Sequence, residues 1–421
     1  MIDGLKTEQL DKGLFRTEAD NGVTVISEHI DRVRSVAVGM WVRTAAVHEH
    51  PSRMGVSHFL EHMVFKGTER RSARDIALEL EVRGGSLDAF TSREHTAFQA
   101  RVLDEDVGPA LDVLTDLVRN PALRQKDLDL EKKVILEEIG MVEDTPDELV
   151  FDIHSETLWP DHPYGYSILG TRDTVASLTA DDLRELHSRA YHPKQVVIAG
   201  AGNLPHDKLL EQLAKCGWFE FPAGPDRPEV PLVPRVTAQE RRIHKKELAQ
   251  THIVMGTDTF PYADPRRYSL MLLTTVLGSG MSSRLFQRVR EQLGLAYAVY
   301  AFQSFYEHVG VSGVYVGTRH DQAEQAVDVI NDEIQRLSKE GLDVPTLEDA
   351  KRQLRGQVTL GMESPSSRMY RAASVVLYGR PYKSLDKILD EIQAVDPSEV
   401  RAVAQEFFVP ERQTSVWLGP N

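Results

Sequence analysis

Two histidines and a glutamate lie close together in the segment HFLEHMVFKG, residues 58–67. Residues three and four positions apart share one face of a helix, so His58, Glu61 and His62 are expected to point the same way. Two neutral imidazoles one turn apart can bind a Zn²⁺ ion, and a glutamate beside them can take a proton from an attacking water. The alternative is three unrelated polar side chains. The apolar residues around them argue against a solvated face and favour the metal interpretation.

A metal ion that takes part in catalysis needs a third protein ligand and one open position. The helical segment LDLEKKVILEEIGMV, residues 128–142, offers a candidate. Val134 and the other apolar residues predict a buried side that also carries Glu138, where a carboxylate is costly unless it is paired or metal-bound. Glu131 lies seven residues earlier on the same face and can accept a hydrogen bond from a ligand imidazole. The alternative for Glu131 is a surface ion pair with a nearby lysine.

The segment GGSLDAFTSREHTAF, residues 84–98, begins with a glycine turn and continues with alternating residues. This pattern predicts an edge strand, which can pair with an extended peptide through main-chain hydrogen bonds. The residues expected to contact such a peptide are Asp88, Ala89, Phe90 and Thr91. On pattern alone, an ordinary edge strand without a ligand is equally compatible.

Arg290 and Tyr297 lie seven residues apart in the second half of the chain, in VREQLGLAYAVYA. A guanidinium and a phenol can donate to a peptide carbonyl, and the phenol can stabilise a developing oxyanion. The alternative is a surface arginine and a core tyrosine.

Composition restricts the kinds of partner and location that we expect. A net charge of −15 argues against nucleic acid as a partner, because phosphates would be repelled. No window of about 18 apolar residues occurs, so we expect no membrane span. The N-terminus lacks the apolar run of a signal peptide and the basic character of a transit peptide, and the single Cys216 suits a reducing compartment. We therefore expect a cytoplasmic protein.

The elements that must position these side chains fall into two halves. The proline-rich segment at 223–235 predicts a linker between an N-terminal domain at 1–222, which carries the expected metal site, and a C-terminal domain at 236–421. Both halves contain strands, then a helix, then further strands and another helix. The predicted fold class is α+β, with two duplicated domains that each have a mainly antiparallel sheet with helices packed on it.

The repeat is visible as a match between residues 110–114 and 326–330, at an offset of 216. The same offset places Thr274, Leu277 and Gly278 opposite His58, Glu61 and His62. A purely structural need for the polar set would be expected in both copies. Its presence in the first half alone therefore favours a chemical role.

The motif H-x-x-E-H followed by a helix that carries glutamates is the inverted zinc motif. Over nearly its whole length the chain resembles the pitrilysin and mitochondrial-processing-peptidase family of metallopeptidases, and its size matches the two-domain branch that works as dimers. Glu138 lies 76 positions after His62, which fits the position of the family's third ligand. The resemblance implies one Zn²⁺ per chain, held by His58, His62 and Glu138. It also implies Glu61 as general base and Glu131 as the supporting glutamate.

The resemblance also assigns expected roles in substrate binding. It implies that the strand with Asp88 to Thr91 holds the substrate beside the zinc, although many members have Asn-Ala where this chain has Asp88-Ala89. It implies that Arg290 and Tyr297 reach the substrate from the C-terminal domain. In a homodimer we expect them to act in trans, on the zinc site of the partner chain.

The function that we expect is a zinc-dependent endopeptidase that cleaves short or unfolded peptides, held as an extended strand in a closed chamber. Two alternatives remain. One is a non-catalytic assembly subunit of the same fold, against which the intact set of His58, Glu61, His62 and Glu138 argues. The other is a peptide-binding module that uses the groove without cleavage.

Overall fold

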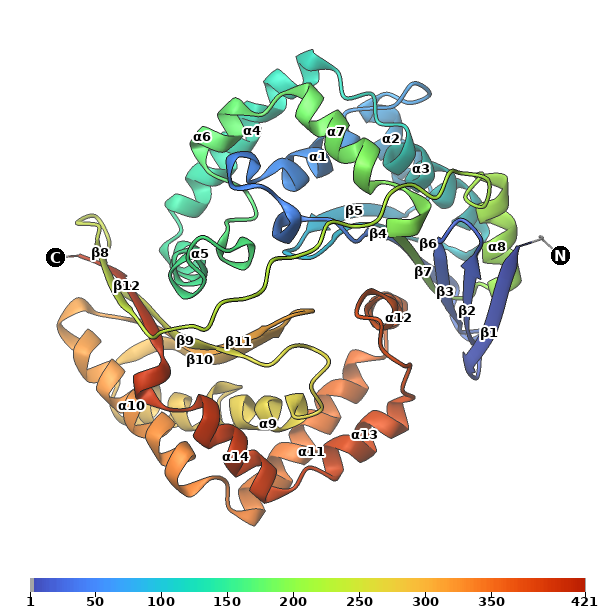
Figure 1. Ribbon diagram of the computed structural model, residues 1–421. Helices are drawn as coiled ribbons and strands as arrows, with labels where there is room; N and C mark the ends of the chain where they lie inside the picture. Colours follow the sequence, from blue (N-terminus) through green and yellow to red (C-terminus); the bar gives the residue numbers. More distant parts are fainter. Residues whose placement is uncertain (1–3, 421) are drawn as a thin grey trace. The chain divides into compact units, whose positions relative to one another are not determined.

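The computed structural model describes residues 4–420, which form two compact units (Figure 1). Unit 1 contains the described residues up to Ile139, together with Tyr166–Val230 and Gly361–Tyr382. Unit 2 contains Gly140–Gly165, Pro231–Leu360 and the described residues from Lys383 onwards.

Unit 1 is built on a seven-stranded sheet with the order β1-β2-β3-β7-β4-β6-β5. Its strands are β1 (Leu5–Asp11), β2 (Leu14–Ala19), β3 (Thr24–His29), β4 (Ser35–Val42), β5 (Ser86–Thr91), β6 (Thr96–Leu103) and β7 (Val196–Gly202). Only β3 and β7 pair in parallel, and the other neighbours are antiparallel. Its helices are α1 (Val56–Val64), α2 (Ala73–Glu81), α3 (Val107–Arg119), α6 (Arg172–Ser177), α7 (Ala180–Ala190), α8 (His206–Lys215) and α12 (Pro365–Leu377). Helix α4 (Gln125–Glu143) belongs to unit 1 for most of its length.

Unit 2 repeats this plan with five strands in the order β10-β11-β9-β12-β8. They are β8 (Glu240–His244), β9 (Thr251–Thr259), β10 (Ala296–Phe305), β11 (Gly310–Thr318) and β12 (Thr414–Gly419), and only β8 and β12 pair in parallel. Its helices are α5 (Pro146–Leu158), α9 (Arg267–Gly278), α10 (Ala323–Glu340), α11 (Val344–Gly361), α13 (Leu385–Gln393) and α14 (Pro397–Phe407). A π-helical segment, η6, spans Phe286–Gln292. The predicted α+β class is confirmed.

The central strands of each sheet are buried on both faces, which explains why they are largely apolar. In β7, Val196 and Ile198 join the core beneath α1, α3 and α4, whereas Val197 and Ala199 pack with α12 on the opposite face. Figure 1 shows α12 on the side of the first sheet that faces away from α1. In unit 2, α5 covers β9 and β12 in the same way.

The offset of 216 residues relates the two units element by element. It carries Ser35 onto Thr251, where β9 begins, and Val107 onto Ala323, where α10 begins. The order β3-β7-β4-β6-β5 corresponds to β8-β12-β9-β11-β10 along the two sheets. The fold is therefore a duplication, as the sequence predicts.

Two helices do not follow the predicted domain bounds of 1–222 and 236–421. Helix α5 lies in the first half of the chain but belongs to unit 2, and α12 lies in the second half but belongs to unit 1. Each packs its apolar side on a sheet that the other half of the chain provides. Residues 222–239, which include the predicted linker at 223–235, form neither helix nor strand.

The predicted edge strand at residues 84–98 is a hairpin instead. β5 ends at Thr91, a turn closes through the bond from the Ser92 amide to the His95 carbonyl, and β6 starts at Thr96. Strands β1 and β2 are not predicted from the sequence. Strand β1 is largely exposed and carries no apolar alternation that could have identified it. In the described part of the chain no helix has the length and apolar character to cross a membrane.

Candidate metal centre

Helix α1 presents His58 and His62 on one face, with their ring centroids 4.5 Å apart. Its apolar residues Phe59, Leu60 and Met63 are buried in the core of unit 1 and fix the helix against the sheet. Burial, helped by the charge of the neighbouring His62, lowers the pKa of His58 to about 3. At neutral pH His58 is therefore uncharged, which is the form that binds a metal ion.

Glu138 of α4 lies opposite both imidazoles. Its Oε2 atom is 3.7 Å from Nε2 of His58 and 3.6 Å from Nε2 of His62, too far for hydrogen bonds. This oxygen is buried and has no hydrogen-bond partner among the described residues. A tetrahedral ion with bonds of about 2.1 Å holds two donor atoms about 3.4 Å apart. The separations and the unpartnered oxygen therefore fit a shared Zn²⁺ ion.

These three side chains form one candidate cluster. Their donor atoms all lie within 4.8 Å of one another, and no other group of three histidine, cysteine or carboxylate side chains converges in this way within residues 4–420. The structure thus brings together the three residues that the sequence predicts as ligands.

Glu138 is less buried than the sequence pattern predicts. Val134 is 50% exposed, and 38% of the Glu138 side chain is exposed. The buried residues of α4 are Leu128, Glu131, Ile135 and Ile139, so Glu138 lies beside the buried face rather than in it. The prediction that Val134 is buried is wrong. Burial of the carboxylate still raises the pKa of Glu138, although the charge of His62 acts against this shift.

Glu131 holds His62 from the side away from Glu138. Its Oε1 atom lies 2.9 Å from Nδ1 of His62, and its Oε2 atom lies 2.5 Å from Nζ of Lys66. Burial acts to raise the pKa of Glu131, but the bonds from His62 and Lys66 lower it overall, so the group is ionised. An ionised carboxylate only accepts, so Nδ1 of His62 is the donor and Nε2 is left to face Glu138.

The pKa of His62 reflects the same contacts. Burial acts to lower this pKa, but the bond to Glu131 and the charges of Glu138 and Glu61 raise it overall. Sequence reasoning missed Lys66, although its position one helical turn after His62 is a signal that could have identified it. Glu131 makes the predicted contact with a ligand histidine, and it is buried rather than in the surface ion pair of the alternative.

Glu61 is buried on the same helix and accepts a hydrogen bond from Oγ1 of Thr91 at 2.5 Å. Burial raises the pKa of Glu61, and the bond from Thr91 offsets part of this rise. A carboxylate with a raised pKa is a stronger proton acceptor. Thr91, predicted as a substrate contact, thus uses its hydroxyl to orient Glu61.

Strand β5 is the last strand of its sheet and pairs with β6 along one side only. Its side chains alternate: Ala89 packs on the core beneath α1, whereas Phe90 contacts Tyr370 of α12 with ring centroids 6.1 Å apart. Asp88 is exposed, and its Oδ1 accepts a bond from the Ala89 amide at 2.9 Å. Among the described residues no strand occupies the outer edge of β5.

Arg290 and Tyr297 lie together in unit 2. The guanidinium of Arg290 lies 4.3 Å from the ring centroid of Tyr297, and its Nη1 donates to the Tyr297 carbonyl at 3.1 Å. Tyr297 is 77% exposed, so the alternative of a core tyrosine is wrong. The π-helical turn at Phe286–Gln292 and the start of β10 thus present a stacked arginine–tyrosine pair whose phenol is accessible.

Unit 2 has no counterpart of this cluster at the equivalent positions. The offset of 216 carries Glu131 and Glu138 onto Leu347 and Leu354, both buried in α11. The duplicated fold therefore carries one candidate metal centre per chain among its described residues.

Duplicated α+β units with a single H-x-x-E-H motif and a distant glutamate define the class of metallopeptidases with the inverted motif. Two family models match the chain: "Insulinase (Peptidase family M16)" over residues 24–172 and "Peptidase M16 inactive domain" over residues 177–354. The chain belongs to peptidase family M16, in its two-domain bacterial branch. The resemblance predicted from the motif is confirmed.

Relatives cover almost the whole chain. It is 40% identical to the protein named uncharacterized zinc protease YmxG of Bacillus subtilis, over 94% of this chain and 96% of the relative. It is 36% identical to an uncharacterized zinc protease of Streptomyces coelicolor, over 99% of this chain and 93% of the relative.

Two crystal structures share the fold. A peptidase M16 inactive domain from Pseudomonas fluorescens has a TM-score of 0.90 and 21% identity, over 97% of this chain and 98% of that one. A protease from Helicobacter pylori has a TM-score of 0.89 and 21% identity, over 99% of this chain and 100% of that one.

Proposed function

We propose that the protein is a zinc-dependent endopeptidase that cleaves short or unfolded peptides. The observation that carries this proposal is the convergence of His58, His62 and Glu138 around a position that suits one ion, with Glu61 on the same helix. Membership of a peptidase family and the names of the relatives support it.

Several side chains of the protein have separate roles in the proposed peptide hydrolysis. A bound Zn²⁺ would supply Lewis-acid polarisation of the attacking water and of the scissile carbonyl. Glu61, with its raised pKa, accepts the proton of the water and passes it to the leaving amine. Glu131 keeps His62 in the tautomer that a metal ligand needs, and Lys66 keeps Glu131 ionised.

Substrate binds as an added strand along β5. The outer edge of β5 offers main-chain donors and acceptors, so recognition depends little on the peptide sequence. Asp88, Ala89, Phe90 and Thr91 are the contact residues, and Thr91 lies one hydrogen bond away from the general base. A closed chamber around this edge would admit an extended peptide and exclude a folded protein.

Arg290 and Tyr297 act on the substrate in trans, from the C-terminal domain of a partner chain in a homodimer. The exposure of Tyr297 and its stacking with Arg290 support this role, because the pair can donate to a substrate carbonyl. The single cysteine fits a cytoplasmic location, where thiols stay reduced.

Subunit complementation tests the action in trans. Glu61→Gln and Arg290→Ala chains should each be inactive alone. In a mixed dimer, the intact zinc site of one chain receives the intact Arg290 of the other, so random mixing should restore roughly a quarter of the sites. If the residues act within one chain, mixing restores nothing.

The peptidase assignment is tested with a diverse library of short peptides. The zinc-loaded protein should cleave members of the library, chelation should stop cleavage, and added zinc should restore it. A fully zinc-loaded protein that binds peptides and cleaves none would instead support the alternative, a non-catalytic peptide-binding or assembly subunit.

A further inference from the structure

The N-terminus of helix α1 lacks a cap from its own first residue. The N-cap is Gly55, with φ of 88°, and a Cβ at this position would lie 2.4 Å from the carbonyl oxygen of Leu169. The close crossing of these two segments therefore requires glycine, which has no side chain to accept the free amides of the first turn.

Glu49, which lies six positions before Gly55, supplies the missing acceptor. Its Oε2 accepts from the Gly55 amide and its Oε1 from the Ser57 amide, both at 2.8 Å. Glu49 is 8% exposed, so solvent screens these charge-assisted bonds very little. In the ionised form of Glu49, the negative charge also suits the positive end of the helix dipole.

This cap matters for the metal centre because His58 directly follows Ser57. The two ligand histidines are held differently: His62 donates through Nδ1 to Glu131, whereas Nδ1 of His58 is buried without a hydrogen-bond partner among the described residues. A ligand histidine usually has such a partner to fix its ring. His58 has no such partner in the described part of the chain, so the position of its ring depends on the backbone of the first turn.

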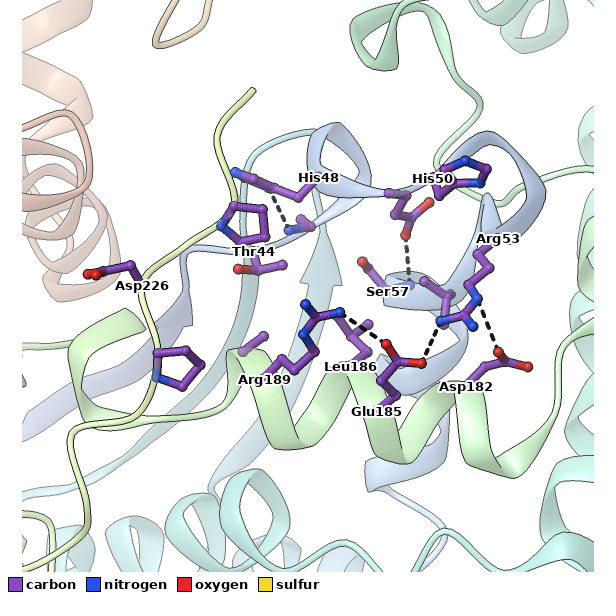
Figure 2. Close-up of a pocket in the computed structure, with 16 residues that line it drawn as sticks. Thr44, His48, His50, Arg53, Ser57, Asp182, Glu185, Leu186, Arg189 and Asp226 are labelled. Carbon is purple, nitrogen blue, oxygen red and sulfur yellow. Dashed lines mark hydrogen bonds and ion pairs between the residues drawn. The ribbon is translucent and has the colours of Figure 1, made fainter. Parts of the chain in front are cut away.

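Glu49 and Ser57 lie in the wall of a cavity of about 430 Å³ in unit 1 (Figure 2). Figure 2 shows the bond that reaches Ser57, and it shows Arg53 of the same loop bridging Asp182 and Glu185 of α7. These pairs hold the loop that carries Glu49. Burial raises the pKa of Glu49 to about 7, and the bonds from Ser57 and Gly55 only partly offset the shift. The fold thus keeps a costly carboxylate at this place.

We propose that Glu49 is a positioning residue of the metal centre, which fixes the first turn of α1 and through it the imidazole of His58. The proposal rests on the proposed function, because it assumes that His58 binds zinc. Glu49 is thereby the counterpart, for the first ligand histidine, of Glu131 for the second.

The test compares zinc affinity in full-length variants by competition with a chelator. Glu49→Ala removes the acceptor, and Glu49→Gln keeps the size of the side chain but retains only one acceptor oxygen. The matched control is Asp396→Ala, which removes a carboxylate that caps α14 of unit 2 by accepting from the Ser398 amide at 2.8 Å. The visible spectrum of the Co²⁺-substituted proteins reports ligand geometry independently of activity.

Both Glu49 variants should bind zinc about tenfold more weakly and alter the Co²⁺ spectrum. Asp396→Ala should lower the melting temperature but leave zinc affinity and spectrum unchanged. Where Glu49→Ala does not fold, Glu49→Gln decides. The proposal is overturned if the Glu49 variants lose stability like the control and keep wild-type zinc affinity. A wild-type protein that binds no zinc would instead overturn the proposed function.

Discussion

Replacing Glu131 by glutamine should weaken zinc binding by about one to two orders of magnitude. The carboxylate accepts from Nδ1 of His62 at 2.9 Å and is 4% exposed, so solvent hardly screens the bond. A hydrogen bond to a charged group contributes about 1.5–3 kcal/mol, against about 0.5–1.5 kcal/mol for a neutral one. The midpoints of these ranges differ by about 1.3 kcal/mol, so losing the charge weakens the zinc-bound state by nearly tenfold in Kd. The unmatched ammonium of Lys66 adds positive charge near the ion and moves the effect in the same direction.

The assay is a chelator competition at fixed pH and salt, with melting curves in excess chelator to confirm that the zinc-free variants fold. Glu137→Gln is the matched control, because Glu137 carries the same charge on the same helix and is exposed. It should bind zinc within about twofold of the wild type, since an exposed charge contributes little. The reasoning is refuted if Glu131→Gln also stays within that range, or if both variants weaken binding equally.

Three further predictions concern the base, its partner and the buried histidines. Glu61→Gln should reduce turnover by about 10²–10⁴-fold while zinc and peptide affinity stay near wild type, and an equal loss of zinc would mean that Glu61 is a ligand rather than the base. Thr91→Val removes the bond that lowers the pKa of Glu61, so the acid limb of the pH profile of kcat/KM should move to higher pH. An unchanged acid limb would mean that Thr91 does not affect the pKa of the base. The zinc-free chain should lose stability to urea between pH 6.5 and about 4, because burial lowers the pKa of His154 and His206 to about 4. Histidines with a lowered pKa stabilise the fold above their unfolded pKa of about 6.5 and lose that contribution as the pH falls. The variant His206→Gln should therefore lose less stability over this pH range than the wild type. A free energy of unfolding that does not change with pH in either protein would contradict the account.

The spacing of residues within one helical turn predicts the part of the metal centre that lies on α1. The positions of His58, Glu61 and His62 follow from helix periodicity within one turn. The duplication could also be predicted from sequence. The offset of 216 residues found there separates the first residues of β4 and β9, and likewise those of α3 and α10. The apolar pattern of α4 also points to Glu138, but it places Val134 in the core, where the structure leaves it half exposed.

The contacts that sequence reasoning misses are tertiary. The bond from Thr91 to Glu61 joins a strand to a helix, and the cap from Glu49 depends on the crossing between Gly55 and Leu169. No local pattern encodes either contact. Sequence reasoning also could not predict that α5 belongs to unit 2 and α12 to unit 1. Each helix has an ordinary apolar side, and no local pattern indicates which sheet will cover it.

The most direct test of the central claim is a crystal structure of the zinc-loaded protein with anomalous scattering at the zinc edge. The account predicts one ion per chain in unit 1, at about 2.1 Å from Nε2 of His58, Nε2 of His62 and a carboxylate oxygen of Glu138. An ion bound elsewhere, or Glu138 turned away beyond bonding distance of an ion held by the two histidines, would contradict it.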